Sequence, residues 1–273
     1  MTKLFTSGFS HLILFIGIFI MIVPVWMIFA SSTHTSSVIN MSGLQMFLGE
    51  SFYDNYLRVL LYKGGFFKEI TALKMFFNSF IMATGVAILS VVTSLMAAYA
   101  LVYYRIKYAS FLFWIIFITI LVPLELRIFP TYSVMAELNL VNSYFGLIVP
   151  ISASAIATLF FRQFYKTVPD ELLESAKLDG ANTWRFFIDF LIPLSKTMIV
   201  AMLIFMFVFG YNQYLWPLLV TTSEQYWTVV MGLKMMSGSI VHRFAFVIMS
   251  MVPPILIIVV LQKHFIKGVF QDK

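Results

Sequence analysis

The sequence predicts an all-α, polytopic membrane protein with six transmembrane helices. Hydrophobic residues make up 61% of the chain and charged residues 11%, whereas a soluble domain carries about 25% charged residues. Six long charge-free runs each contain one apolar segment, close to the roughly 20 residues that a membrane-spanning helix needs. A polar stretch, residues 170–193, separates the fourth of these segments from the fifth.

The first span is expected over residues 12–30 and is interpreted as an uncleaved anchor. Its apolar run of 19 residues exceeds the hydrophobic region of a signal peptide, which has about 7–15 residues. A long loop follows, and the second span, residues 76–102, carries small side chains that let helices approach closely. We therefore expect an anchor helix with an extracytoplasmic loop over residues 1–73 and a transmembrane domain over residues 74–273.

The third span, expected over residues 111–129, carries two charges near its far end, Glu125 and Arg127. Charges at membrane depth are costly and are candidates for function. Pro123 and Pro130 flank the pair, so irregular backbone that lines a cavity is one reading of this segment. Two interpretations stay open: Arg127 faces an anionic substrate, or the two residues form an interfacial ion pair at the outer end of the helix.

The fourth span is expected over residues 145–161, and the polar stretch follows it. The stretch keeps apolar residues at helical spacing, which predicts two short amphipathic helices with a bend between them. Residues 169–171, Pro-Asp-Glu, favour a helix start because proline needs no N–H there and carboxylates stabilise the positive helix end. Gly180 suits the end of the first helix, Asn182 or Thr183 can cap the second, and Pro193 is expected to end it.

The fifth span, residues 199–219, is interrupted by polar residues, and the sixth is expected over residues 244–261. The interruption contains Asn212, Gln213 and Trp216. Asn212 and Trp216 are four residues apart and would share one face of a continuous helix. Polar side chains in a span either bind a solute or hold helices together, and both readings stay open for these three residues.

The polar stretch also resembles the EAA loop of bacterial ABC-importer permeases. The family pattern is Glu-Ala-Ala, three residues, Gly, nine residues, Ile, one residue and Leu-Pro. The chain matches its spacing with Glu174-Ser175-Ala176, Gly180 and Phe190-Leu191-Ile192-Pro193, and it departs from the pattern at Ser175, Phe190 and Ile192. An ordinary amphipathic connector between spans is the alternative interpretation.

The resemblance implies that residues 166–196, called the polar loop below, face the cytoplasm and dock into a cleft on an ATPase subunit. The loop would then act as a rigid lever on the third to fifth spans. The coupling positions that the resemblance implies are Glu171, Glu174, Ala176, Asp179, Gly180, Ala181, Arg185 and Pro193.

A wider similarity covers roughly residues 75–270 and points to the carbohydrate-uptake (MalG-like) group of ABC-importer permeases, nearest to members that import sn-glycerol-3-phosphate. The segments that carry it are 121–131, 160–164, 193–197 and 211–219. It implies a type I (MetI-like) permease fold and import of sn-glycerol-3-phosphate or a related glycerophosphodiester by alternating access, with a neutral sugar as the alternative. It also implies three kinds of partner: a second, unlike permease subunit, a cytoplasmic ATP-binding subunit dimer and a periplasmic solute-binding protein.

Charge distribution predicts the orientation in the lipid bilayer. If the polar loop is cytoplasmic, eleven of the eighteen Lys and Arg residues lie on its side of the membrane. Basic residues gather in cytoplasmic loops, so we expect a multi-pass protein of the bacterial inner membrane with both termini in the cytoplasm.

Several function classes are disfavoured. The chain has no cysteine, its four histidines are far apart, and no GxxxxGK[ST] phosphate loop occurs. We therefore expect no cofactor, no metal site, no enzymatic activity and no binding of ATP by the chain itself. Basic residues do not form a stripe interleaved with aromatics, which argues against a nucleic-acid partner. A stand-alone secondary transporter stays as a less favoured alternative, because such proteins carry acidic residues in several spans and often a repeat.

Overall fold

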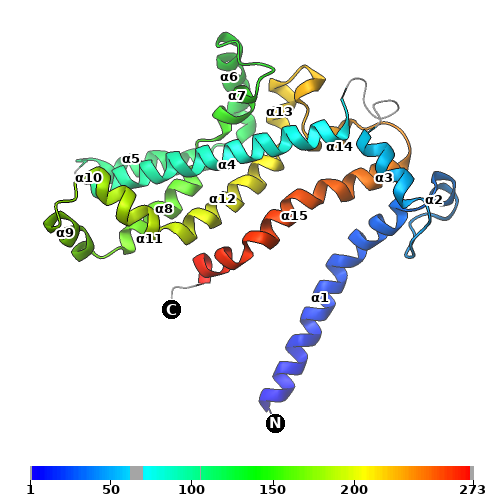
Figure 1. The fold of residues 1–273 in the computed structure, drawn as a ribbon, viewed down its shortest axis with the longest axis horizontal. Helices are drawn as coiled ribbons and strands as arrows, with labels where there is room; N and C mark the ends of the chain where they lie inside the picture. The colour runs from blue at the N-terminus through cyan, green and yellow to red at the C-terminus, as the bar shows by residue number, and fades with distance from the viewer. Residues whose placement is uncertain (1, 62–69, 105, 271–273) are drawn as a thin grey trace. The chain divides into compact units, whose positions relative to one another are not determined.

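The computed structural model describes residues 2–61, 70–104 and 106–270, and every regular element in these ranges is a helix (Figure 1). The all-α prediction is confirmed for this part of the chain. Residues 62–69 of the expected extracytoplasmic loop lie outside the described residues. The first residue and the last three also lie outside them, and the prediction that both termini face the cytoplasm includes these residues.

The chain divides into two compact units. The first contains residues 1–76 and 231–252, and the second contains residues 77–230 and 253–273. The first boundary lies close to the expected boundary at residue 73. The second segment of the first unit was not expected, because it is distant in sequence and only packing brings it to the N-terminal helices.

The first unit is built from the N-terminal helices and the region before the last span. Side-chain hydrogen bonds connect its segments. The Asn55 side-chain amide donates to the carbonyls of Ser32 and His34, both at 2.8 Å, and the hydroxyls of Ser36 and Ser239 share a hydrogen bond. Residues 31–73 were expected to form a loop, but two helices lie within this range. The helices that lie wholly or partly in this unit are α1 (Thr2–Ser32), α2 (Ser36–Ser42), α3 (Phe52–Leu61), α4 (Ala72–Tyr103), α14 (Val229–Met235) and α15 (Ile240–Phe270).

Within the described residues, three helices are long and apolar enough to span a membrane, and counting each of three bent helix pairs as one span gives up to six, the predicted number. Three spans are single helices: Ser10–Ser32, Ala72–Tyr103 and Ile240–Leu261. Three are bent pairs: Ala109–Leu121 with Glu125–Glu137 at 103°, Tyr144–Ile151 with Ala155–Thr167 at 49°, and Thr183–Leu194 with Lys196–Tyr211 at 74°. All three bends lie in the second unit.

The third span, expected over residues 111–129, is broken in the structure, in agreement with the reading of irregular backbone around Pro123. Helix α5 (Ala109–Ile118) passes into a 3₁₀ turn and ends, and α6 (Leu124–Glu137) starts in a new direction. Val122 has extended backbone, with ψ of 112°, because a residue before proline is sterically disfavoured in the helical region. Pro123 then precedes the first turn of α6, whereas Pro130 lies inside that helix without ending it.

The fourth and fifth spans are also broken, and side-chain caps mark the helix starts. Ser143 accepts a hydrogen bond from the backbone of Gly146, and Ser154 accepts one from Ala157, so each hydroxyl satisfies a free N–H of a helix start. The fifth span stops at Tyr211 and resumes at Leu215, as its polar interruption predicted. The helices concerned are α7 (Tyr144–Ile148), α8 (Ala155–Thr167), α12 (Lys196–Tyr211) and α13 (Leu215–Val220).

Small residues bring the second and fifth spans together. A Cβ atom added at Gly210 of α12 would lie 3.1 Å from the Cα of Ala83 and 3.2 Å from the Cβ of Val86, both on α4. The two helices can approach this closely because neither side presents a large side chain at the contact. The small residues of the second span thus serve helix packing, as predicted.

Candidate functional site

The polar loop begins with α9 (Asp170–Leu178), which ends in a backbone motif that requires Gly180. Gly180 has a φ of +77°. Its N–H donates to the carbonyl of Lys177 at 3.0 Å, and the N–H of Ala181 donates to the carbonyl of Ala176 at 2.9 Å. These are the two hydrogen bonds of a Schellman motif, in which glycine is favoured because its φ is positive. The predicted helix end at Gly180 is confirmed.

The second half of the loop is one bent run of helix from α10 (Thr183–Arg185) to α11 (Ile192–Leu194). Asn182 caps its start, since its side-chain oxygen accepts from the N–H of Arg185 at 2.8 Å. The middle, residues 186–191, is π-helical, which sequence analysis did not predict. The helix ends one residue beyond Pro193, whose missing N–H leaves the carbonyl four residues earlier without its α-helical donor.

An aromatic core fixes both halves of the polar loop to three spans. Tyr99 donates from its hydroxyl to the carbonyl of Thr183 at 2.7 Å, and its ring centroid lies 4.7 Å from that of Phe187. No residue of α5 belongs to this core among the described residues, so the polar loop packs on the second, fourth and fifth spans, whereas the sequence resemblance named the third to fifth. The core residues are Val91, Leu95, Ala98, Tyr99, Ala157, Phe161, Tyr165, Ala176, Phe186, Phe187, Leu191 and Met202.

The polar loop exposes four large apolar side chains, Leu178, Trp184, Ile188 and Leu194, and the first two flank the Gly180 bend. Leu178 is 89% exposed and Trp184 is 56% exposed, on either side of the Gly180 bend. Leu178 and Trp184 were not among the coupling residues predicted from the sequence. Both lie off the apolar face that packs against the spans.

The predicted coupling residues divide between the two faces. Ala176 is buried and Ala181 packs against the core. Arg185 lies 3.8 Å from Asp189, and both side chains are more than half exposed, so this ion pair adds little stability. The predicted residues on the exposed face are Glu171, Glu174, Asp179, Gly180, Arg185 and Pro193.

A cavity of about 320 Å³ lies where the bent helices of the second unit meet. Its walls come from the end of α5, from α6, from the α7–α8 connection and from α12 and α13. Most lining residues are apolar, and the polar ones are Thr119, Arg127, Thr131 and Ser154. Among the described residues that line this cavity, Arg127 alone is charged.

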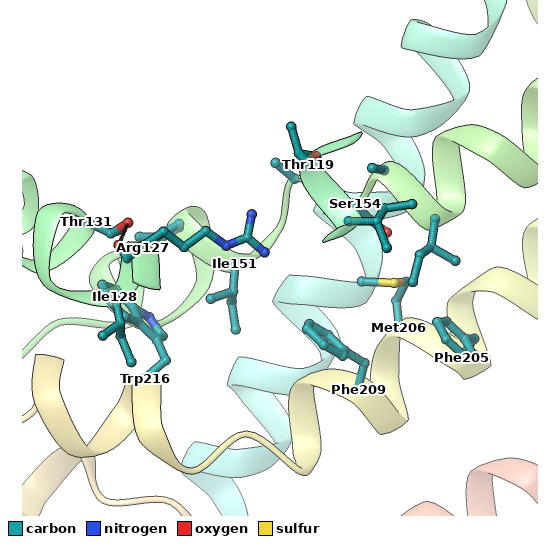
Figure 2. A pocket seen from close by; sticks show the side chains of 15 residues that line it. Thr119, Arg127, Ile128, Thr131, Ile151, Ser154, Phe205, Met206, Phe209 and Trp216 are labelled. Carbon is teal, nitrogen blue, oxygen red and sulfur yellow. Dashed lines mark hydrogen bonds between the residues drawn. The ribbon is translucent and has the colours of Figure 1, made fainter. Parts of the chain in front are cut away.

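Arg127 reaches into this cavity from α6. Figure 2 shows its side chain extending across the cavity toward Thr119 and Ser154, with Ile151 below it. No ion pair with Glu125 forms within the described part of the chain, and Glu125 does not line the cavity. The interpretation as an ion pair with Glu125 therefore has no support among the described residues, and Arg127 faces the cavity instead.

The other expected path residues lie in different surroundings. Trp216 lines the cavity, is 1% exposed and donates from its indole nitrogen to the carbonyl of Gly146 at 3.0 Å. Asn212 and Gln213 do not line the cavity, and the Gln213 side chain donates to the carbonyl of Phe209 at 3.2 Å. The expected shared helical face of Asn212 and Trp216 is wrong, because α12 ends at Tyr211 and the next helix begins only at Leu215.

Known proteins resemble this chain over nearly its whole length. The family described as "Binding-protein-dependent transport system inner membrane component" matches residues 90–271. The sn-glycerol-3-phosphate transport system permease protein UgpE of Brucella melitensis is 39% identical over 272 residues, which cover 97% of this chain and 96% of that protein. The protein of the same name from Pectobacterium atrosepticum is 38% identical over 271 residues, with the same coverage. This chain belongs to the binding-protein-dependent transport system inner membrane component family.

Membership of this family makes the chain an ABC-importer permease subunit of the inner membrane, with ATP-binding and solute-binding proteins as partners. The fold agrees. A bacterial ABC transporter involved in the import of the acidic polysaccharide alginate contains a chain that matches with a TM-score of 0.82 at 21% identity. The match covers 97% of this permease and 98% of that chain. The predicted ABC-importer permease fold is therefore confirmed.

Proposed function

We propose that this permease moves sn-glycerol-3-phosphate or a related glycerophosphodiester across the inner membrane by alternating access, as the names of its relatives suggest for those proteins. The observation that carries the proposal is Arg127 in the cavity of the second unit, where it is the charged lining residue. Arginine is suited to a phosphate because its planar guanidinium offers two parallel N–H donors. The Ser154 hydroxyl, which accepts from the N–H of Ala157, can donate its own hydrogen to a phosphate or glycerol oxygen, whereas the hydroxyls of Thr119 and Thr131 already donate to backbone carbonyls.

The polar loop would supply the mechanical coupling. Its buried face packs against α4, α8 and α12, and two of these helices border the cavity or continue into its walls. A closely packed core transmits displacement because it has little free volume to absorb it. Movement of the loop by an ATPase would thus reach the cavity through the second, fourth and fifth spans.

The proposed assembly is a hetero-dimer with a second, unlike permease subunit, a cytoplasmic ATP-binding subunit dimer and a periplasmic solute-binding protein. We propose that the polar loop and both termini face the cytoplasm. The coupling role rests on Glu171, Glu174, Ala176, Asp179, Gly180, Ala181, Arg185 and Pro193. The solute path rests on Arg127 and Trp216, whereas Glu125, Asn212 and Gln213, also expected there from the sequence, do not line the cavity. The cavity supports Arg127 and Trp216 most directly.

Transport by the assembled importer in proteoliposomes tests the proposal. With the solute-binding protein outside and ATP on the ATPase side, we expect uptake of sn-glycerol-3-phosphate that stops when ATP is omitted. Uptake of a neutral disaccharide instead of sn-glycerol-3-phosphate would overturn the proposed substrate, whereas the proposed role as a permease would stand. Accumulation of solute by this chain alone, without nucleotide, would overturn the ATP-driven mechanism in favour of a secondary transporter.

Leu178 provides a direct test of the proposed docking face. We expect Leu178→Asp to weaken association with the ATP-binding subunit about tenfold, because a carboxylate replaces an apolar side chain at a desolvated contact. Membrane insertion should be unchanged, since Leu178 is almost fully exposed in this chain. Co-purification of the ATP-binding subunit measures the effect, with Lys234→Asp, an exposed change on α14, as control. Equal co-purification of both variants would place the docking surface elsewhere.

A further inference from the structure

Arg162, on α8, is a buried cation without an ionic partner. The residue is 8% exposed, and its Nε atom has no hydrogen-bond partner. Its guanidinium carbon lies 3.8 Å from the centroid of the Phe113 ring on α5. Among the described residues, no carboxylate lies within ion-pair distance of Arg162.

The aromatic contact alone does not account for this burial. A desolvated cation over an aromatic ring gains less free energy than an ion loses when it is removed from water, even after relaxation. Buried charges are therefore normally paired or bound to an ion of opposite sign. The balance implies that an anion joins Arg162 when the protein is in its membrane.

A second cavity, called the Arg162 cavity, has room for such an anion. Its volume is about 510 Å³, and α5 and α8, which pack together, form its walls. Lys166 lies four residues after Arg162 on the same helical face and lines the cavity as a second cation. Gln163 and Ser110 supply neutral donors, and no acidic residue is among the described lining residues.

The position of the Arg162 cavity identifies the source of the anion. Its polar residues lie at the start of α5 and the end of α8, where the polar loop begins and where the ends of these candidate spans would meet the membrane surface. Trp114 and Phe117 extend the lining along α5 with aromatic surface, and Trp114 is 57% exposed. A ligand that fits both ends of the cavity has a phosphate group at the membrane surface and an apolar part along the span.

We propose that the Arg162 cavity binds the phosphate headgroup of an anionic phospholipid. Arg162 and Lys166 contact the phosphate, Gln163 and Ser110 bind polar headgroup atoms, and the acyl chains lie along Trp114 and Phe117. Basic pockets between membrane helices are known to select anionic lipid headgroups in this way. The site is distinct from the solute cavity, since the two share no lining residue.

Native mass spectrometry of the full-length chain after exchange into equal amounts of phosphatidylglycerol and phosphatidylcholine tests the site. We expect one phosphatidylglycerol retained at least about fivefold over phosphatidylcholine, and about a tenfold loss of that retention in Arg162→Gln, because a charge-assisted hydrogen bond to phosphate is removed. Lys166→Gln should lower retention less, and Lys234→Gln, which removes a charge outside the cavity, should leave it unchanged.

Further arms separate the possible outcomes. Inorganic phosphate at millimolar concentration should not displace the lipid, and displacement would show that a free phosphate is the ligand. Equal retention of the two lipids, or wild-type retention in Arg162→Gln, would overturn the proposal. If Arg162→Gln does not yield folded protein by size-exclusion chromatography, Lys166→Gln decides in its place, and wild-type retention there would equally overturn the site.

Discussion

Gly180→Pro is expected to abolish solute uptake by the assembled importer while leaving insertion of the chain into the membrane intact. Proline fixes φ near −65°, whereas Gly180 has a φ of +77°. Proline also removes the N–H that donates to the carbonyl of Lys177 at 3.0 Å. The Schellman motif would be lost, and the chain would leave α9 in a different direction. ATP hydrolysis by the partner should then continue without driving transport.

A matched control separates this backbone effect from a general effect of substitution. Asparagine tolerates positive φ, and a Cβ atom at Gly180 would meet nothing within 4 Å. We therefore expect Gly180→Asn to keep most of the uptake. Uptake and ATP hydrolysis measured on the same proteoliposomes distinguish the variants. Normal uptake by the proline variant would remove the polar loop from the coupling mechanism.

The second large effect is expected from Arg127→Ala. Loss of the charged residue in the solute cavity should raise the apparent KM for sn-glycerol-3-phosphate about tenfold or more, because a hydrogen bond between charged groups contributes about 1.5–3 kcal/mol. Arg127→Lys keeps the charge but loses the planar pair of donors, so its effect should be intermediate. Initial rates of ATP-dependent uptake at varied concentrations of the binding protein loaded with solute measure these differences.

Glu125 provides the control for the Arg127 prediction. It lies two residues away on α6 but does not line the cavity, so Glu125→Gln should leave the kinetics close to wild type. If Arg127→Ala has wild-type kinetics as well, Arg127 is not part of the solute path. If Glu125→Gln changed the uptake kinetics strongly and Arg127→Ala did not, the solute path would lie on the other side of α6.

The bend before α6 shows where prediction from sequence reached its limit. Pro123 and Pro130 were both recognised as possible breaks, but only Pro123 ends a helix. Proline restricts the residue before it and removes a donor, yet Pro130 is accommodated inside α6. Which proline interrupts a helix depends on how the flanking helices pack. That packing involves residues far away in the sequence, so the local pattern around each proline does not contain it.

The polar loop was more predictable, because its structure is mostly local. Helix α9, its end at Gly180 and the cap at Asn182 depend on hydrogen bonds between residues at most five positions apart. The exposed Leu178 and Trp184 were not predicted. Their exposure depends on the orientation of the loop on α4, α8 and α12, which local patterns do not contain.

The sequence by itself determined the membrane class, the six apolar segments and the two capped helices of the polar loop, since hydrophobicity and capping act over one helix or one turn. The resemblance in the EAA pattern added the ABC-importer permease family. Only the tertiary structure decided that Arg127 and Trp216 line one cavity while Asn212 and Gln213 do not. Only the tertiary structure showed that the guanidinium of Arg162 lies over the Phe113 ring. Both outcomes depend on helices that are distant in sequence, and close packing places their side chains together.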